Sequence, residues 1–464
     1  MKLKPYPEYK DSGVSWLGQI PAHWDIKPGF AFLSERKEKN TGMKESTVLS
    51  LSYGQIVVKP PEKLHGLVPE SFETYQIAEP GNIIIRGTDL QNDKVSLRVG
   101  KVRNRGIITS AYLCLETKEK FNPDYAHLLL HGYDLMKIYY GMGSGLRQNL
   151  SFSDFKRLPL LAPPESEQSK INKYLQSIQV QINKFIRNKR RLIELLKEQK
   201  QNIINQAVTR GLDPNVKLKP SGVKWIGDIP EYWSFLKLKR IACVKTGYAF
   251  KSDHYKSVGI PLIRIGDLKH SGLVDIKQAV KLQESDLTHF SCFKIQYGDL
   301  LMAMTGATIG KVAKYQHQTE ALLNQRVCSF RSFESKCFQD YLLFILSSEV
   351  YLKQVTIFCY GGAQPNISDS TLMSFKIPVP PISEQQAILS YVQEQTKTTD
   401  SAVSRAEREI ELIQEYYTRL MSDVVTGQVD VRDIEVPEIT EEDLLTLEDK
   451  SEVVDDDLVQ EEDE

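Results

Sequence analysis

The sequence lacks long hydrophobic runs, paired cysteines and a targeting segment. Its longest apolar runs, such as residues 342–346, fall far below the roughly 18 residues that span a membrane, so we expect no membrane partner. No charged segment followed by an apolar one opens the chain, which predicts a cytosolic protein without a secretory signal. The six cysteines never form a CxxC pair, which predicts reduced, mostly buried thiols rather than a zinc site or a disulfide framework.

Motifs for methyl transfer are incomplete. Asn122-Pro123-Asp124-Tyr125 resembles the NPPY-type motif with which amino-methyltransferases hold a flipped adenine, but aspartate replaces the second proline. Residues 338–341 occupy the same place in the second half of the chain, so a helix N-cap followed by proline accounts for the motif. No FxGxG-type cofactor loop follows a predicted strand. We therefore expect no catalytic centre.

Two further patterns suggest ligands but have simpler explanations. Residues 306–312 (GATIGKV) resemble a phosphate loop without the Ser or Thr that would hold magnesium, and they predict a turn between strands. His127 and His131 lie four residues apart on one predicted helix face, but their segment has no third metal ligand. We expect this chain to bind neither a cofactor nor a metal.

The near-zero net charge conceals a strong asymmetry. Residues 434–464 hold fifteen Asp and Glu against one Lys, so this acidic tail carries −14 and the rest of the chain carries +13. The tail has no periodic pattern and is expected to be disordered. A basic body suits binding to phosphates, although many basic proteins bind no nucleic acid.

The chain is an internal duplication in sequence. Residues 12–24 (SGVSWLGQIPAHW) return as residues 221–233 (SGVKWIGDIPEYW), with eight of thirteen positions identical. Three further matches are GLRQNLS at 145–151 with GAQPNIS at 362–368, PPESEQ at 163–168 with PPISEQ at 380–385, and GKV at 100–102 with GKV at 310–312. A shift of 217 residues holds without a gap from residue 145 to residue 209, so each copy is a divergent domain followed by a segment of constant length.

The constant segment is predicted to be a long helix. Each diproline is followed by Ser-Glu-Gln, interpreted as a cap and acceptors for the first turn. Apolar residues then recur at coiled-coil spacing over about 44 residues, roughly 65 Å. The predicted seam comprises Ile171, Leu175, Ile178, Ile182, Phe185, Leu192, Leu196, Ile203, Ile388, Val392, Ala402, Ala406, Ile413, Tyr416 and Leu420.

These elements predict an α/β protein with a coiled coil. Two mixed α/β domains, residues 1–162 and 211–379, alternate with long helices at residues 163–210 and 380–427, and residues 434–464 form the tail. If the helices pair with each other, the chain order makes them antiparallel and places the domains at opposite ends, related by a pseudo-twofold axis. Strand-like runs at 82–86, 95–102 and 107–115 precede a helix near Pro123, with counterparts at 299–304, 309–315 and 322–330 before a helix near Gln339.

Basic residues crowd one segment of the first domain. Arg98, Lys101, Arg103 and Arg105 lie close in sequence, and the last three alternate, which places them on one face of an extended strand. A strand laid against phosphates and a solvated edge strand both fit this pattern. The corresponding basic residues of the second copy are Lys311 and Lys314.

Two glycine-opened loops supply candidate base contacts. Arg147, Gln148 and Asn149 in the first copy, and Gln364 and Asn366 in the second, can make bidentate contacts to purine edges. Because the loops recur in both copies, a structural or backbone-contact role fits them equally well. Residues that read different bases should differ between copies, so base readout is expected mainly in the variable stretches.

The paired SGVxWxGxIPxxW motifs, the Pro-Pro-x-Ser-Glu-Gln helix starts and the alternation of variable domain with constant helix resemble the specificity subunit of type I restriction-modification systems. The resemblance covers residues 1 to about 433 and leaves out the acidic tail. It implies two target-recognition domains, each reading one half of a split double-stranded DNA sequence. The helices would space the domains and dock two modification subunits, which methylate adenine.

The resemblance also implies a division of labour. S-adenosylmethionine, ATP and Mg would be bound by partner subunits, among them ATP-driven restriction subunits that translocate and cut DNA. The main interpretation is a non-catalytic DNA-recognition subunit acting in phage defence. The alternatives are a self-contained DNA adenine methyltransferase and a coiled-coil adaptor between proteins.

Overall fold

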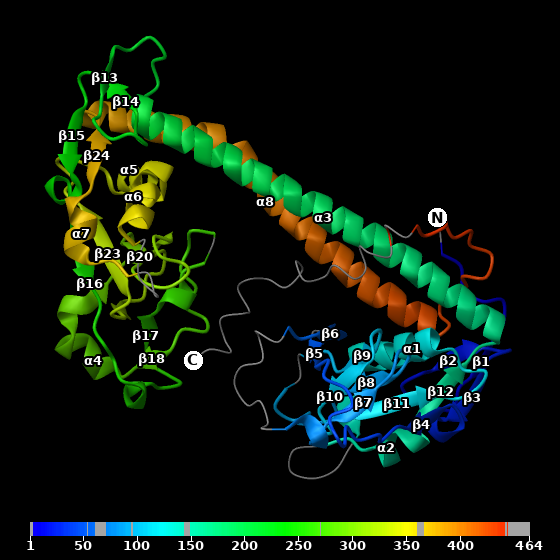
Figure 1. The fold of residues 1–464 in the computed structure, drawn as a ribbon. Coiled ribbons are helices and arrows are strands. Elements are labelled where there is room, and N and C mark those ends of the chain that lie inside the picture. The colour runs from blue at the N-terminus through cyan, green and yellow to red at the C-terminus, as the bar shows by residue number, and fades with distance from the viewer. Residues whose placement is uncertain are drawn as a thin grey trace. The chain divides into compact units, whose positions relative to one another are not determined.

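The computed structural model describes residues 3–52, 54–60, 71–93, 96–142, 149–269, 271–359, 366–440 and 443. The chain divides into two compact units (Figure 1). The first unit comprises Met1–Asn188 and Arg408–Val453, and the second comprises Lys189–Glu407 and Val454–Glu464. Each unit contains one mixed α/β domain together with part of each long helix, α3 (Glu165–Arg210) and α8 (Ile382–Val425).

A four-stranded antiparallel sheet forms the centre of the first unit. Its order is β4 (Leu33–Glu35), β11 (Leu113–Thr117), β8 (Ile83–Ile85) and β9 (Val99–Lys101). Two-stranded ladders join β1 (Tyr9–Asp11) to β2 (Gln19–Pro21), β3 (Asp25–Pro28) to β12 (Pro159–Ala162), β5 (Leu49–Ser52) to β6 (Gln55–Val58), and β7 (Gln76–Ala78) to β10 (Gly106–Ile108). The helices of this domain are α1 (Pro123–Leu135) and α2 (Phe152–Arg157). The run at 107–115 predicted as one strand is thus divided between β10 and β11.

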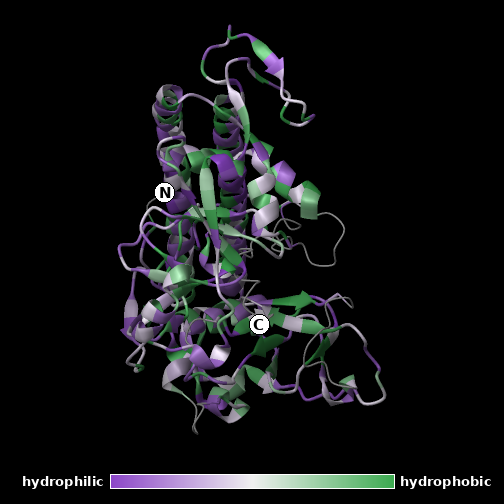
Figure 2. Cartoon of the chain, turned by 90° about the vertical axis from the view of Figure 1, so that its left-hand side faces the viewer, coloured by the Kyte–Doolittle hydropathy of each residue, from purple (hydrophilic) through white to green (hydrophobic). Residues whose placement is uncertain are grey.

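The second unit repeats this central sheet. Its order is β16 (Ala242–Thr246), β23 (Val327–Ser332), β20 (Leu300–Ala303) and β21 (Val312–Lys314), and the smaller ladders are β13 (Leu218–Pro220) with β14 (Asp228–Pro230) and β15 (Ser234–Lys237) with β24 (Lys376–Val379). A further sheet has the order β18 (Lys281–Leu282), β17 (Ile260–Ile263), β22 (Ala321–Leu323) and β19 (Lys294–Ile295). The helices are α4 (Glu284–His289), α5 (Gln339–Ser347), α6 (Glu349–Cys359) and α7 (Asp369–Ser374). Hydrophobic residues line the strands of both units (Figure 2).

Strand register aligns the two units differently from the GKV match in the sequence. Ile83 in β8 pairs with Lys101, and Leu300 in β20, 217 residues later, pairs with Lys314. Lys101 is therefore equivalent to Lys314 and not to Lys311. The sequence match was wrong by three residues because short strands of alternating apolar and basic residues resemble one another at several offsets.

The glutamine after each diproline fastens the helix start to its domain. The Gln168 side chain donates to the carbonyl oxygens of Pro163 and Lys120, at 2.9 and 3.3 Å, and accepts from the backbone N–H of Asn122 at 2.9 Å. Gln385 makes the corresponding bonds to Pro380, Lys336 and Phe338. The interpretation of Ser-Glu-Gln as a helix cap was therefore wrong: α3 begins at Glu165, one residue earlier, and the side chain serves a tertiary contact.

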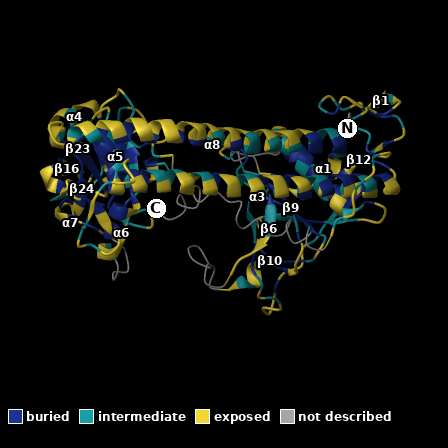
Figure 3. Ribbon diagram, turned by 90° about the horizontal axis from the view of Figure 1, so that it is seen from above, coloured by how far each residue is buried: buried dark blue, intermediate teal, exposed yellow. Residues whose placement is uncertain are grey.

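The long helices pair antiparallel within each unit. In the first unit, Ile171 and Leu175 near the start of α3 lie in one buried cluster with Met421 and Val425 near the end of α8. In the second unit, Ile204 and Val208 near the end of α3 share a cluster with Ile388 and Val392 near the start of α8. The two clusters use equivalent positions, 217 residues apart. Elsewhere much of the surface of both helices is exposed (Figure 3).

The helix seam follows a longer period than the predicted heptads. The prediction that Phe185, Leu192 and Tyr416 lie in the buried seam was wrong, since these residues are 36%, 42% and 48% exposed. Ile186 and Ile193 are buried in place of the first two. An α-helix has 3.6 residues per turn, so a strict 3.5-residue pattern drifts off the buried face by about 20° per heptad.

The other predicted seam positions lie on the inward face to differing degrees. The buried ones are Ile171, Leu175, Ile182, Ile388, Val392, Ala406 and Leu420, and the partly buried ones are Ile178, Leu196, Ile203, Ala402 and Ile413.

Three smaller expectations also need correction or limits. The tail was expected to be disordered from residue 434, but Ile434 and Val436 pack against the core of the first unit. Thiols were expected to be mostly buried, yet Cys243 and Cys292 are exposed. Among described residues, no single helix is long and apolar enough to cross a membrane, although α5 and α6, bent by 54°, reach that length and composition together.

Candidate nucleic-acid interface

Arg98 is buried, whereas the sequence-based hypothesis placed it on a strand face that contacts DNA. Its side chain is fully buried, and its guanidinium donates to backbone carbonyl oxygens, including those of Arg86 at 3.1 Å and Thr88 at 2.7 Å. Its Nε donates to the Tyr140 hydroxyl at 3.2 Å. A buried cation needs such partners because its desolvation is otherwise very costly. The residue therefore has a structural task inside the domain.

The other basic residues of this segment do not share one strand face. β9 ends at Lys101, and a bend follows before β10, so Arg103 and Arg105 are exposed in a connection and not in a strand. Arg105 forms ion pairs with Glu45 at 3.3 Å and Glu79 at 3.0 Å. The predicted alternation on one strand face was wrong because the chain turns after Lys101.

Lys101 and Lys314 form matched ion pairs in the two units. Lys101 pairs with Asp124 in the first turn of α1, and Lys314 pairs with Asp340 in the first turn of α5, at 2.5 Å. Each pair ties a strand of the central sheet to the helix that packs beside it. This shared fastening accounts for both lysines, so a phosphate would have to compete with an aspartate. Lys311 is partly buried, just before β21.

The described residues that end the two glycine-opened loops occupy equivalent places in the two units. Arg147, Gln148 and Gln364 lie outside the described residues. Asn149 and Asn366 are exposed, and each is followed by a matched backbone bond. The N–H of Leu150 donates to Gly87 at 2.7 Å, and that of Ile367 to Met304 at 3.1 Å. The described residues Leu150 and Ile367 therefore adjoin the end of β8 or β20 in each central sheet.

Three connections meet at that end of the sheet in the second unit. The N–H of Tyr248, after β16, donates to Leu323, and the N–H of Gln325 donates back to Tyr248. The N–H of Met304, after β20, donates to the carbonyl of Arg326. At Gly247 an added Cβ would lie 2.2 Å from two backbone oxygens, so only glycine permits this approach. These backbone hydrogen bonds join the three connections into one surface.

Tyr248 is held on an aromatic platform within this surface. Its ring lies 5.1 Å from Phe250, 4.9 Å from Phe290 and 5.3 Å from Phe293, yet the residue remains 42% exposed. Gln325 and Arg326 are exposed beside it in the loop between β22 and β23. Arg and Gln are suited to guanine and adenine edges, and an aromatic ring suits a thymine methyl or a base step.

The sequence-based search missed Tyr248, Gln325 and Arg326. A usable signal existed, since residues 324–326 (NQR) contain the same three residue types as residues 147–149 (RQN), which were selected. What the sequence did not display was the proximity of residue 248 to residue 325, because the strands between them pair across the sheet.

The motif at residues 122–125 is structural, as predicted. The Asn122 side chain accepts from the backbone N–H groups of Asp124 at 2.8 Å and Tyr125 at 3.3 Å, with Pro123 in the first turn of α1. Tyr125 is fully buried, and its hydroxyl donates to the carbonyl of Val425 at 3.4 Å. A tyrosine in this position has no face available to a flipped base.

Comparison with known proteins shows which proteins this chain resembles. Residues 230–412 match the family model described as the type I restriction modification DNA specificity domain. The chain is 26% identical over 337 residues to the type I restriction enzyme MjaVIII specificity subunit of Methanocaldococcus jannaschii, covering 71% of this chain and 76% of that protein. It is 27% identical over 175 residues to the EcoAI specificity subunit of Escherichia coli, covering 37% of this chain and 29% of that protein.

A solved structure shares the fold. A chain from a study of complex assembly and conformational transition of the type I R-M system aligns with a TM-score of 0.56 at 13% identity, covering 88% of this chain and 99% of its own. Residues 230–412 are thus similar in sequence to a DNA specificity domain. The resemblance seen in the sequence is confirmed: this chain is similar to the type I restriction-modification specificity subunits.

Proposed function

We propose that this protein is the non-catalytic DNA-recognition subunit of a type I restriction-modification complex, and that each unit reads one half of a bipartite target. The observation that carries the proposal is a common framework with different loops. Both units contain the same four-stranded sheet order, the same ion pair between strand and helix, and an asparagine loop at the same sheet end. The loops around that asparagine differ in sequence, as two different half-sites require.

The two copies are proposed to be related by a pseudo-twofold axis, with the recognition domains at opposite ends of the paired helices. Equivalent helix positions form the buried cluster in each unit, which supports this arrangement. The exposed surface along α3 and α8 would then dock two modification subunits. Restriction subunits would join that complex, and S-adenosylmethionine, ATP and Mg would be bound by these partners in the cytoplasm.

The alternative functions have less support. A self-contained methyltransferase would need an accessible tyrosine in its NPPY-type motif, whereas Tyr125 is buried. A coiled-coil adaptor has no need of a preorganised surface such as that formed by Tyr248, Gln325 and Arg326, nor of a basic body. Recognition of DNA accounts for both features.

Two measurements on the assembled complex test the proposal. Methylated adenines mapped in DNA exposed to the complex should define a split sequence with a constant gap. Filter binding of the complex to that DNA should weaken steeply between low and physiological salt, because phosphate contacts release counterions. Methylation without a bipartite sequence, or binding insensitive to salt, would contradict the proposal.

A further inference from the structure

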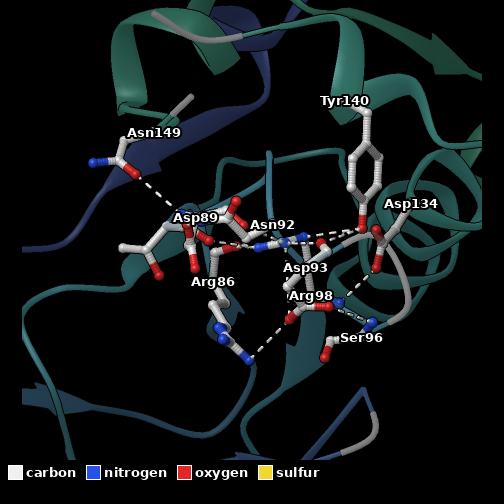
Figure 4. A network of polar contacts seen from close by, with 10 residues as sticks. Arg86, Asp89, Asn92, Asp93, Ser96, Arg98, Asp134, Tyr140 and Asn149 are labelled. Carbon is white, nitrogen blue, oxygen red and sulfur yellow. Dashed lines mark hydrogen bonds and ion pairs between the residues drawn. The ribbon is translucent and has the colours of Figure 1, made fainter. Parts of the chain in front are cut away.

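Arg98 is the centre of a closed hydrogen-bond network in the first unit (Figure 4). It precedes β9 and is fully buried, while the chain from residue 86 to residue 93 wraps around its guanidinium. Besides the carbonyls of Arg86 and Thr88, the guanidinium donates to those of Asp89, at 3.4 Å, and Asp93. One planar, permanently charged side chain therefore orders the backbone of a whole loop.

Side chains of the loop close the same structure. Asn149, from the glycine-opened loop, accepts the backbone N–H of Asp89 at 3.1 Å. Asp89 has a left-handed backbone, with φ of 57°, and its carboxylate accepts from the Asn92 side chain at 2.8 Å. Arg86 lies 3.4 Å from the carboxylate of Asp93. The loop is thus held from inside by Arg98 and from the flank by Asn149.

The outer side of the loop carries two exposed amides, Gln91 and Asn92. Asn and Gln are the side chains that bind adenine through N6 and N7 together, provided that their position is well defined. The hydrogen bonds of Arg98 fix the loop backbone that carries these amides, and they do so from the buried side of the loop. Other basic residues of the chain would contact the DNA phosphates.

The second unit has a different structure at this place. Ile85 pairs with Val99, and Met302 pairs with Val312, so thirteen residues connect the strands in the first unit and nine in the second. By this register Lys311 stands where the first unit has Arg98. A loop that differs in length and support within a shared framework is where two different half-sites would be distinguished.

We propose that residues 86–93 form a base-reading loop for one half-site, in which Gln91 and Asn92 contact base edges and Arg98 is the positioning residue. The proposal rests on the proposed function, and its test separates the two. The assembled complex is used throughout, and its methylation pattern is mapped over a DNA library in which both half-sites are randomised.

The first variant combines Gln91→Ala with Asn92→Ala. Both side chains are exposed, so folding should be retained, while discrimination at one or two positions of one half-site falls about fivefold to hundredfold. The matched control is Gln325→Ala, which should relax the other half-site and leave the first intact. An unchanged first half-site, in a wild-type complex that reads a bipartite target, would overturn the loop assignment. A wild-type complex without a bipartite target would instead overturn the proposed function.

The second variant, Arg98→Lys, keeps the charge and loses the planar array of donors. A positioning role predicts relaxed specificity confined to the half-site affected by the double alanine variant, while the lost buried hydrogen bonds lower the thermal unfolding midpoint. Unchanged discrimination at that half-site, with methylation lowered equally at all sites, would show a general structural role and overturn the assignment of Arg98. If this variant fails to fold, the double alanine variant still decides the role of the loop.

Discussion

Nε1 of Trp24 lies 3.1 Å from Oε1 of Glu167, so the tryptophan that ends the first repeated motif is fastened to the first turn of α3. The same carboxylate accepts from Tyr6 and lies 2.8 Å from Nε2 of His23. In the second unit, Glu384 accepts from Trp233 at 3.0 Å and from Tyr232 at 2.9 Å. The repeated motif therefore serves to join each domain to its helix.

Replacing Glu167 should weaken this junction strongly. Glu167 is buried, so Glu167→Ala leaves two buried donors without an acceptor and should cost about 2–3 kcal/mol of unfolding free energy. Glu384→Ala is the matched control and should cost less, about 1–2 kcal/mol, because only Trp233 is left as a buried donor without an acceptor, while Tyr232 is 56% exposed and regains water. Urea unfolding measures both, and hydrogen exchange locates the loss. Equal losses would show that burial of the carboxylate does not set the difference.

Two neighbouring residues test the register of the helix seam. Ile193 is 8% exposed and Leu192 is 42% exposed. Ile193→Ala should therefore lower the free energy of unfolding by about 2–4 kcal/mol, while Leu192→Ala should change it by less than about 1 kcal/mol. Thermal or urea unfolding of both variants decides between this register and the strict heptad pattern. A larger effect at Leu192 would support the heptads.

Asp267 should make the second unit sensitive to pH. Burial raises the pKa of Asp267 to about 6, against the opposing effect of the Arg264 backbone N–H that it accepts. Because the folded pKa exceeds the unfolded value near 4, this contribution to stability is complete below pH 4 and is lost as pH rises through about 6.

The variant Asp267→Asn keeps an acceptor but cannot ionise. Its unfolding free energy relative to wild type should rise between pH 4 and pH 7, by about 3 kcal/mol at most. Urea unfolding across this range measures the difference. Asp253→Asn, which alters an exposed carboxylate of the same unit, is the matched control. A constant difference for Asp267→Asn would mean that folding does not raise the pKa of this carboxyl.

Shortened chains should separate the packed start of the acidic tail from the rest. A chain ending at Asp433 loses the apolar contacts of Ile434 and Val436 and should lose about 1–2 kcal/mol of stability in the first unit. A chain ending at Thr440 should keep its stability and, if the remaining tail is a solvated extension, the DNA affinity of the complex. Tighter binding by the shorter chain would show instead that the tail masks the basic surface.

The paired helices are proposed to set the gap between the half-sites. Four residues inserted in each helix, after Asn188 and after Glu407, should lengthen the pair by about 6 Å and rotate one end by roughly 40°. At about 3.4 Å per base pair, the gap should widen by about one or two base pairs while both half-site sequences persist. Methylation mapping of the assembled complex reads this directly. An unchanged gap in an active complex would show that other contacts hold the domains apart.

Local sequence was sufficient to predict the long helices, the N-cap at Asn122 and the recurrence of one domain framework, because these depend on residues close together in the chain. The predicted helices at residues 163–210 and 380–427 correspond to α3 and α8, which begin directly after the diprolines. The side chains of Gln168 and Gln385 bind back to the prolines Pro163 and Pro380.

Only the tertiary structure revealed the features that depend on residues far apart in the sequence. Arg98 looks like a surface cation in the sequence, and only the loop that returns around it makes it a buried organiser. The equivalence of Lys101 with Lys314 follows from strand pairing, and the proximity of Tyr248 to Gln325 follows from a sheet whose neighbours are not consecutive. The seam at Ile186 and Ile193 required the true helical repeat, since a periodic sequence pattern leaves an uncertainty of one residue that only packing resolves.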